Sequence, residues 1–250
     1  MAPLNELSRF LDTFLRIHDV PDEPGAVNGL QLDAGADVVR IACAVDASEA
    51  AVDEAIAQSA QLLLVHHGLL WGGNRPLTGT HGRKLRKCFG AGLSVYGAHI
   101  PLDVHPEVGN NVGLVRALGL TAGGTFAPYK GIDIGLWSAC DHSLATLMQK
   151  LEDAVGPVKA LGAGPDRIRR VGVVTGSGGS FVSAAARAGL DALITGEGPH
   201  HTAIDAEERG LHLLMGGHYR TETYGVKSLG ELLAKQFGLS TVFVGRDSGL

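Results

Sequence analysis

The sequence predicts an α/β fold built from two similar lobes, and three observations lead to this prediction. Apolar runs of strand length alternate with helical stretches rich in alanine and leucine, a pattern typical of βαβ units. The pattern occurs twice, once in each half of the chain. In both halves, histidines or carboxylates follow directly after apolar runs, and strand ends are where ligands bind in open α/β sheets.

The elements of the first half follow from periodicity. Apolar residues between Leu4 and Leu15 recur at helical spacing and are interrupted by charges, which predicts an amphipathic helix. A strand, an alanine-rich helix and a buried strand then form a first βαβ unit, and a basic helix leads to another strand. The expected ranges are a helix over 4–15, strands over 38–45, 62–65 and 93–98, and helices over 47–60 and 84–89.

The second half contains a further βαβ unit. Helices are expected over 112–118 and 144–154, and a strand over 168–174 that leads into a glycine-rich turn at 176–179. Residues 121–135 are rich in glycine and their pattern favours neither a helix nor a strand.

The two halves can be aligned with each other. Leu62–Val65 then falls on Ala192–Thr195, and His67 falls on Glu197. In a second alignment the strand ending at His99 falls on the one ending at His218, so that both halves carry His-x-x-x-carboxylate just beyond a strand. We infer an N-terminal lobe, residues 1–125, and a C-terminal lobe, residues 126–250. A pseudo-twofold axis would relate the lobes and bring their strand ends to one cleft.

Composition excludes several classes of function. The 250-residue chain is 45% hydrophobic with a net charge of −5, which argues against a nucleic-acid binder, because such proteins carry a basic stripe. Cys43, Cys88 and Cys140 are widely spaced and form no Cys-x-x-Cys motif, which fits a reducing cytoplasm. No apolar run approaches the roughly 20 residues needed to cross a membrane, and the first helix is not a signal peptide. A cytoplasmic protein is expected.

Paired histidines follow the buried strand over 62–65. Adjacent strand residues point to opposite faces, so His66 and His67 would need a turn of the chain at Gly68 in order to face one site. An alternative interpretation is a polar strand end with two hydrogen-bonded histidines. The supply of similar groups at other strand ends favours a functional site.

The predicted cleft collects imidazoles and carboxylates without any thiolate. Such a set is typical of a catalytic or regulatory site for divalent Zn, Mn, Fe or Co. Two ions are favoured over one, because a carboxylate can bridge ions that lie about 3.5 to 4 Å apart. A hydrogen-bonded polar interface between the lobes is the alternative. The residues concerned are His66, His67, His99, Asp103, His105, Glu197, His218 and Glu222.

Several motifs resemble a known family. The chain is similar to the dinuclear-metal-centre hexameric family, the interacting-factor-three-like proteins, which often bear the name GTP cyclohydrolase 1 type 2. The matching segments cover almost the whole chain, and those at 105–111 and 217–222 are long and specific. They are Asn28-Gly-Leu-Gln31, Val45-Asp46, His66-His67-Gly68 with Trp71, the block from Gly97 to Asn111, Thr195-Gly196-Glu197 and Gly217-His218-x-x-Thr221-Glu222.

The resemblance implies a ring-shaped homohexamer of two-lobed subunits with two divalent ions per chain. Zinc is the expected ion, with Mn, Fe or Co as alternatives. By resemblance, Asp103 and Glu222 bridge the ions, and the family's inserted domain is absent because the chain is too short for it. The ligands implied are His66, His67, Asp103, His218 and Glu222, and the groups beside them that orient ligands or transfer protons are His99, His105 and Glu197.

The expected function is a metal-dependent hydrolase acting on a small molecule. Resemblance adds one specific reaction, the hydrolytic opening of the guanine imidazole ring of GTP by metal-activated water. The alternative is a non-catalytic metal-binding or regulatory scaffold. Two weaker signals stay open: Gly176-Ser-Gly-Gly179 would cradle a phosphate or form a tight turn, and the pair His200 and His201 belongs either to the surface or to the site.

Overall fold

The computed structural model describes residues 1–73 and 75–249. The chain groups into two compact units. Unit 1 comprises Met1–Leu102 and Gly225–Arg246, and unit 2 comprises Asp103–Tyr224 with the residues from Asp247 onward. This grouping differs from the predicted halves 1–125 and 126–250: residues 103–125 belong to unit 2, and the chain returns to unit 1 at Gly225.

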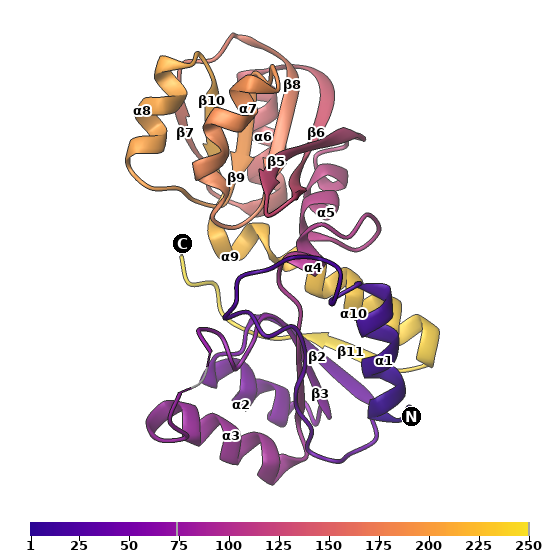
Figure 1. The fold of residues 1–250 in the computed structure, drawn as a ribbon. Coiled ribbons are helices and arrows are strands. Elements are labelled where there is room, and N and C mark those ends of the chain that lie inside the picture. The colour runs from indigo at the N-terminus through magenta and orange to yellow at the C-terminus, as the bar shows by residue number, and fades with distance from the viewer. Residues whose placement is uncertain (74, 250) are drawn as a thin grey trace. The chain divides into compact units, whose positions relative to one another are not determined.

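Unit 1 is built on a mostly parallel sheet (Figure 1). The strand order is β1-β4-β3-β2-β11; β1 alone is antiparallel to its neighbour among the described residues. Its elements are α1 (Leu4–Phe14), β1 (Gly29–Leu32), β2 (Arg40–Asp46), α2 (Glu49–Ala57), β3 (Leu62–His67), α3 (Gly79–Ala91), β4 (Ser94–Gly97) and β11 (Ser240–Phe243). Of the three boundaries between the units, one falls within the helix α4 (Ile100–Asp103), one within the helix α10 (Thr223–Phe237), and the third follows Arg246.

Burial on both faces explains the apolar strands of unit 1. Ala42, Leu63 and Val95 face a core shared with α2 and α3, which lie side by side (Figure 1). On the opposite face α10 approaches β2 so closely that a side chain at Gly230 would overlap with the Cys43 sulfur. Parallel strands enclosed in this way are near-continuously apolar, which is the pattern that predicted β2 and β3.

Unit 2 contains a mixed sheet with the order β5-β6-β8-β9-β10-β7. Its centre, β8-β9-β10, is parallel, and the remaining pairs are antiparallel. The elements are α5 (Asn110–Ala117), β5 (Ala122–Tyr129), β6 (Ile132–Ser143), α6 (Leu144–Val155), β7 (Lys159–Gly162), β8 (Arg167–Val174), the 3-10 helix η1 (Gly178–Phe181), α7 (Val182–Arg187), β9 (Ala192–Thr195), α8 (His201–Glu208), β10 (His212–Met215) and α9 (His218–Thr221).

The α/β fold class is confirmed, and the predicted elements recur; the helix expected over 84–89 is longer than predicted, at Gly79–Ala91, and the other ends shift less. The largest addition is in residues 121–135, where the glycine-rich stretch forms β5 and the start of β6. Gly123 and Gly124 lie against the Trp137 side chain, so this hairpin uses glycine to accommodate the indole. The short strands β1, β7 and β11 and the helix α10 are further elements that the pattern did not indicate.

Candidate metal centre

Three histidines come together in unit 1. His66 and His67 are the last two residues of β3, and His99 follows β4, the next strand in the sheet. Their ring centroids lie 4.7 Å (66 to 67), 4.9 Å (66 to 99) and 5.6 Å (67 to 99) apart. One ring nitrogen from each lies within 4.8 Å of the others, so the three could hold a metal ion. Both paired histidines lie within β3, which ends at the residue before Gly68.

All three imidazoles are oriented in the same way. Nδ1 of His66 lies 2.9 Å from the Ala98 carbonyl oxygen, and Nδ1 of His67 lies 2.8 Å from Oδ1 of Asp46. Nδ1 of His99 lies 2.7 Å from Oδ1 of Asp22. Carbonyl and carboxylate oxygens accept hydrogen bonds, so each Nδ1 donates, and in the neutral form of each ring Nε2 carries the lone pair. Histidines that bind metals are held in this way by a partner on the other nitrogen.

Asp22 organises the surroundings of His99. Its second carboxylate oxygen accepts from Asn28 Nδ2 at 2.8 Å and from the Ile100 backbone N–H at 3.0 Å. Asn28 in turn accepts from the His99 backbone N–H at 2.8 Å. Burial alone would raise the pKa of Asp22, but the hydrogen bonds from His99 and Asn28 outweigh it and lower the pKa. The carboxylate therefore stays ionised beside His99.

Buried amides hold the Asp103 carboxylate in unit 2. Asn110 Nδ2 donates to Oδ1 of Asp103 at 2.8 Å, and the Thr175 hydroxyl lies 3.4 Å from the same oxygen. Asn111 donates to the Asp103 backbone carbonyl at 3.1 Å and accepts from the Thr175 N–H at 2.9 Å. The two asparagines at the start of α5 therefore fix Asp103, Asn110 through its carboxylate and Asn111 through its backbone carbonyl.

His218 lies between two carboxylates of unit 2. Its Nδ1 is 2.7 Å from Oε1 of Glu197, and its Nε2 is 3.2 Å from Oε2 of Glu222, a residue that is almost fully buried. Burial alone would lower the pKa of His218, but hydrogen bonds and charge from Glu222 and Glu197 raise it to about 9. In the absence of a metal, the imidazolium therefore neutralises part of this acidic group.

The glycine-rich turn after β8 packs against the acidic group formed by Glu197, His218 and Glu222. Gly176 has a φ of +63°, and a side chain there would overlap with the Glu222 carboxylate. The backbone N–H groups of Gly176 and Gly178 donate to the hydroxyls of Thr221 (3.0 Å) and Thr195 (2.9 Å). Because these amides have partners inside the protein, the structure favours a tight turn over a phosphate cradle.

Other predicted residues have different surroundings. Nδ1 of His105 accepts from the N–H groups of Glu107 (3.2 Å) and Val108 (3.3 Å), so neutral His105 carries its proton on Nε2. His200 and His201 are exposed at the start of α8. Among the described residues, neither His105 nor Glu197 belongs to a group of three donors with metal-binding spacing.

Sequence reasoning missed Asp22, whose partner lies far away in the chain. Asp22 sits in a segment between two prolines that reads as a break between elements, and no local pattern connects it to His99. The sequence presents Asp46 as a strand end, Asn28 as a turn residue and both as parts of segments that match the family, but none of these observations assigns them a hydrogen-bond partner. Their roles depend on contacts that form when the strands align.

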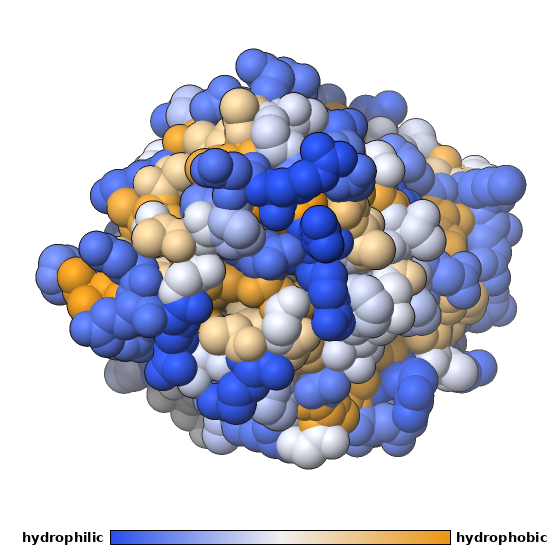
Figure 2. All heavy atoms as spheres, turned by 90° about the horizontal axis from the view of Figure 1, so that it is seen from above, coloured by the Kyte–Doolittle hydropathy of each residue, from blue (hydrophilic) through white to orange (hydrophobic). Residues whose placement is uncertain are grey.

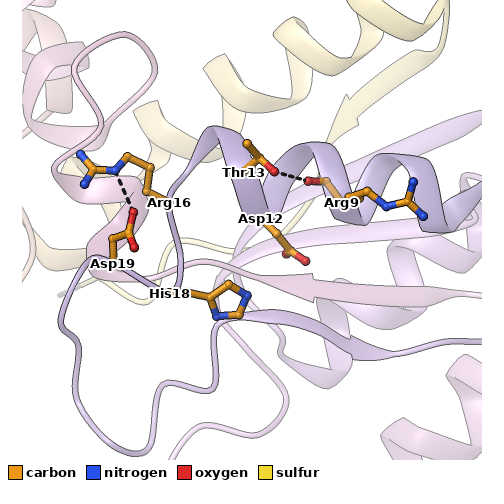
Figure 3. Close-up of a pocket in the computed structure, with 6 residues that line it drawn as sticks. All are labelled: Arg9, Asp12, Thr13, Arg16, His18 and Asp19. Atoms are coloured by element: carbon orange, nitrogen blue, oxygen red, sulfur yellow. Dashed lines mark hydrogen bonds and ion pairs between the residues drawn. The ribbon is translucent and has the colours of Figure 1, made fainter.

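A separate polar pocket of about 380 Å³ lies along α1 and the turn that follows it (Figure 3). Its lining interacts internally: the Thr13 hydroxyl donates to the Arg9 carbonyl oxygen, and Arg16 pairs with Asp19 at 3.2 Å. None of the predicted site residues lines this pocket. The lining residues are Arg9, Asp12, Thr13, Arg16, His18 and Asp19.

The surface and the helices bear on whether the chain contains a membrane-spanning segment. The face drawn in Figure 2 is mostly hydrophilic, with hydrophobic residues in small separate patches. Among the residues that the structure describes, no helix has the length and apolar character required to span a bilayer.

Comparisons with known proteins are consistent along the entire chain. A family model, Duf34/NIF3 (NGG1p interacting factor 3), matches residues 2–248. A GTP cyclohydrolase 1 type 2 homolog of Deinococcus radiodurans is 41% identical, with 98% of this chain and 94% of that protein covered. The protein of the same name from Pyrococcus horikoshii is 40% identical, with 98% and 99% covered.

Solved structures agree with these matches. The protein ybgI, of unknown function, has a TM-score of 0.90 and 34% identity, with 98% of this chain and 99% of that chain covered. A protein from Thermus thermophilus has a TM-score of 0.89 and 38% identity over the same shares. The predicted family resemblance is thereby confirmed.

Proposed function

Because the chain belongs to the DUF34/NIF3 family, we propose that it is a divalent-metal-dependent hydrolase acting on a small molecule. One observation carries the proposal. His66 and His67 each commit Nδ1 to an oxygen acceptor, which leaves Nε2 as the ligand atom, and a ring nitrogen of His99 lies within 4.8 Å of one from each of them. Such an arrangement suits cation binding better than a plain polar strand end.

The proposed ligand set consists of the five residues that the family resemblance implies. His66 and His67 would supply two imidazole donors, and the remaining three donors would be another imidazole and two carboxylates. We propose that this set binds two divalent ions, with zinc expected and Mn, Fe or Co as alternatives. The donor chemistry supports this, because imidazoles and carboxylates without thiolate are typical of catalytic centres. The unit 2 donors are Asp103, His218 and Glu222, of which the two carboxylates are the proposed bridges.

Divalent ions would supply Lewis-acid chemistry, which activates water and polarises the bond that breaks. The neighbouring side chains then have distinct roles. Glu197 orients His218 through Nδ1. His99, held by Asp22 through Nδ1, presents Nε2 and is the proposed proton acceptor. His105 carries its proton on Nε2 and is suited to donate a hydrogen bond.

The relatives' shared name supports a specific reaction. Both proteins described above are called GTP cyclohydrolase 1 type 2 homolog, so we include hydrolytic opening of the guanine imidazole ring of GTP as the first reaction to test. The second candidate is a non-catalytic scaffold that binds metal, which would use the same ligands. Turnover, and not metal binding, distinguishes them.

The test measures turnover by metal-loaded protein. Protein stripped of metal is reconstituted with Zn or Mn, its metal content is measured by elemental analysis, and hydrolysis is followed across nucleotides, phosphoesters and peptides. We expect close to two ions per chain and turnover that disappears in His67→Ala. No bound metal after reconstitution would refute the metal centre. Two bound ions without turnover of any compound would favour the scaffold.

The family resemblance also leads us to propose a homohexamer. Light scattering at micromolar concentration should then give about six times the chain mass of 26.0 kDa. A monomer under these conditions would contradict the proposal.

A further inference from the structure

A partly exposed tryptophan lies beside the histidines of unit 1. Trp71 follows β3 in the chain and keeps 36% of its surface exposed. Its indole packs roughly at right angles to His67, with centroids 5.2 Å apart at 66°, and to His99, at 4.6 Å and 78°. Two imidazoles of the candidate metal centre therefore support one side of an aromatic platform.

Hydrogen bonds hold the loop that carries this platform. The N–H of Leu70 donates to Oε1 of Gln31 at 3.2 Å, and the Gln31 amide donates to the Val27 carbonyl oxygen at 2.7 Å. On the other side of Trp71, the N–H of Gly72 donates to the Gly25 carbonyl oxygen at 3.0 Å. Because the backbone is fixed before and after Trp71, the exposed indole surface has a defined position. Preorganised aromatic surfaces of this kind bind ligands at low entropic cost.

Positive charge lies next to the platform. The Arg75 guanidinium donates to the Trp71 carbonyl oxygen, and its side chain is exposed. Burial lowers the pKa of Lys84, and Arg75 lowers it further, although Glu49, Asp46 and nearby groups act in the opposite direction. Within the described part of the chain, neither Arg75 nor Lys84 forms an ion pair with a carboxylate. A bound anion would relieve this local repulsion.

We propose that Trp71 and Arg75 form a subsite for a planar aromatic ring that carries an anionic group. The ring stacks on the exposed indole, and the guanidinium contacts the anion. This inference rests on the proposed function, because the ring would lie beside His67 and His99. It adds the residues that select the substrate class: a flat aromatic anion is bound, and a peptide or an aliphatic phosphoester lacks the ring that Trp71 recognises.

The experiment separates the two halves of the subsite with three probes. Guanosine offers a ring, inorganic triphosphate offers an anion, and GTP offers both. Binding to the full-length, metal-loaded protein is measured by calorimetry. Stacking on an aromatic side chain contributes roughly 1–3 kcal/mol, so Trp71→Ala should weaken guanosine and GTP about 5- to 150-fold. It should change triphosphate binding less than about twofold.

The reciprocal variant is Arg75→Gln, which should weaken GTP and triphosphate about tenfold and leave guanosine unchanged. Arg86→Gln is the matched control, since Arg86 is an exposed cation of α3 and should affect none of the three probes. Trp71→Phe, which keeps an aromatic ring, should retain most of the binding. If Trp71→Ala lowers the melting temperature or metal content, Trp71→Leu replaces it.

The outcomes also separate this proposal from the hydrolase itself. Unchanged guanosine binding in Trp71→Ala, or no binding of guanosine and GTP by the parent protein, overturns the subsite. Ring binding that depends on Trp71 in a protein without turnover supports the subsite and refutes the hydrolase. Turnover that is indifferent to Trp71 supports the hydrolase and overturns the subsite.

Discussion

The two units prepare for a cation by different means. In unit 1, hydrogen bonds from Nδ1 turn neighbouring imidazoles so that Nε2 atoms converge. In unit 2, charge dominates: Glu197 and Glu222 hold a proton on His218, whose pKa is about 9. An ion that binds His218 at neutral pH must displace that proton. The comparison teaches that candidate donors can be prepared by orienting imidazoles, as in unit 1, or by gathering negative charge around an imidazole, as in unit 2.

The largest effect on metal content should come from removing the charge of Glu222 in unit 2. Glu222→Gln keeps the shape of the side chain and removes its charge, so a bridging role predicts that both ions are lost. Elemental analysis after reconstitution should fall from about two ions per chain to near zero. His67→Ala, which removes one imidazole of unit 1, is the comparison variant and should retain more metal. Loss of a single ion in Glu222→Gln would show that Glu222 does not bridge.

The next effect tests orientation in unit 1. Asp22→Asn removes the charge that holds His99, and changes to such supporting groups typically cost about 10- to 100-fold in metal affinity or activity. We expect turnover to fall by that amount while the melting temperature changes little. Asp19→Asn, an exposed carboxylate of the same unit, is the control. Equal turnover in both variants would remove Asp22 from the site.

A third test concerns packing around the acidic group. Gly176→Ala combines a positive φ with overlap against Glu222, and should lower the free energy of unfolding by about 1–3 kcal/mol and reduce metal content. Gly238→Ala is matched in backbone conformation, with a φ of +66° and no atom within 4 Å of the added carbon. Denaturant unfolding should therefore show the smaller loss for Gly238→Ala. Similar losses would mean that backbone strain, and not Glu222, accounts for the effect.

The smallest expected effect is a pH-dependent change in stability at Glu49, which is not among the candidate metal ligands. Hydrogen bonds from Arg83 and then Lys87 lower the pKa of Glu49 to about 2. A carboxyl with a lowered pKa stabilises the folded state above its unfolded pKa, near 4.5, and this contribution disappears as the pH falls toward 2. Melting temperatures of Glu49→Gln and the parent should therefore differ slightly at pH 6 and converge near pH 2. Glu6→Gln, an exposed change on α1, is the control for the loss of one surface carboxylate.

Local patterns explain what could be predicted. The strand β3 consists of the apolar run Leu62–Val65 followed by two histidines. Both of its faces are covered, so the run is apolar without interruption, and this feature predicted a buried strand. Donor types at strand ends likewise indicated metal chemistry. The edge strand β11 was not predicted, because Ser240–Phe243 is short and becomes a strand only by pairing with β2. Asp22 was not predicted for the same reason, because its role depends on a contact with His99, which is distant in the chain.

The return of the chain to unit 1 has a consequence for biosynthesis. A ribosome completes residues 1–102 long before Ser240–Phe243, so the edge of β2 that pairs with this segment stays open until the segment has emerged. Residues 103–224 are contiguous and have their own sheet, so they are able to fold cotranslationally while unit 1 is still incomplete. Pairing across such a separation closes a long loop and slows the final step. Pairing of Ser240–Phe243 with β2 therefore completes a sheet whose other strands are made much earlier.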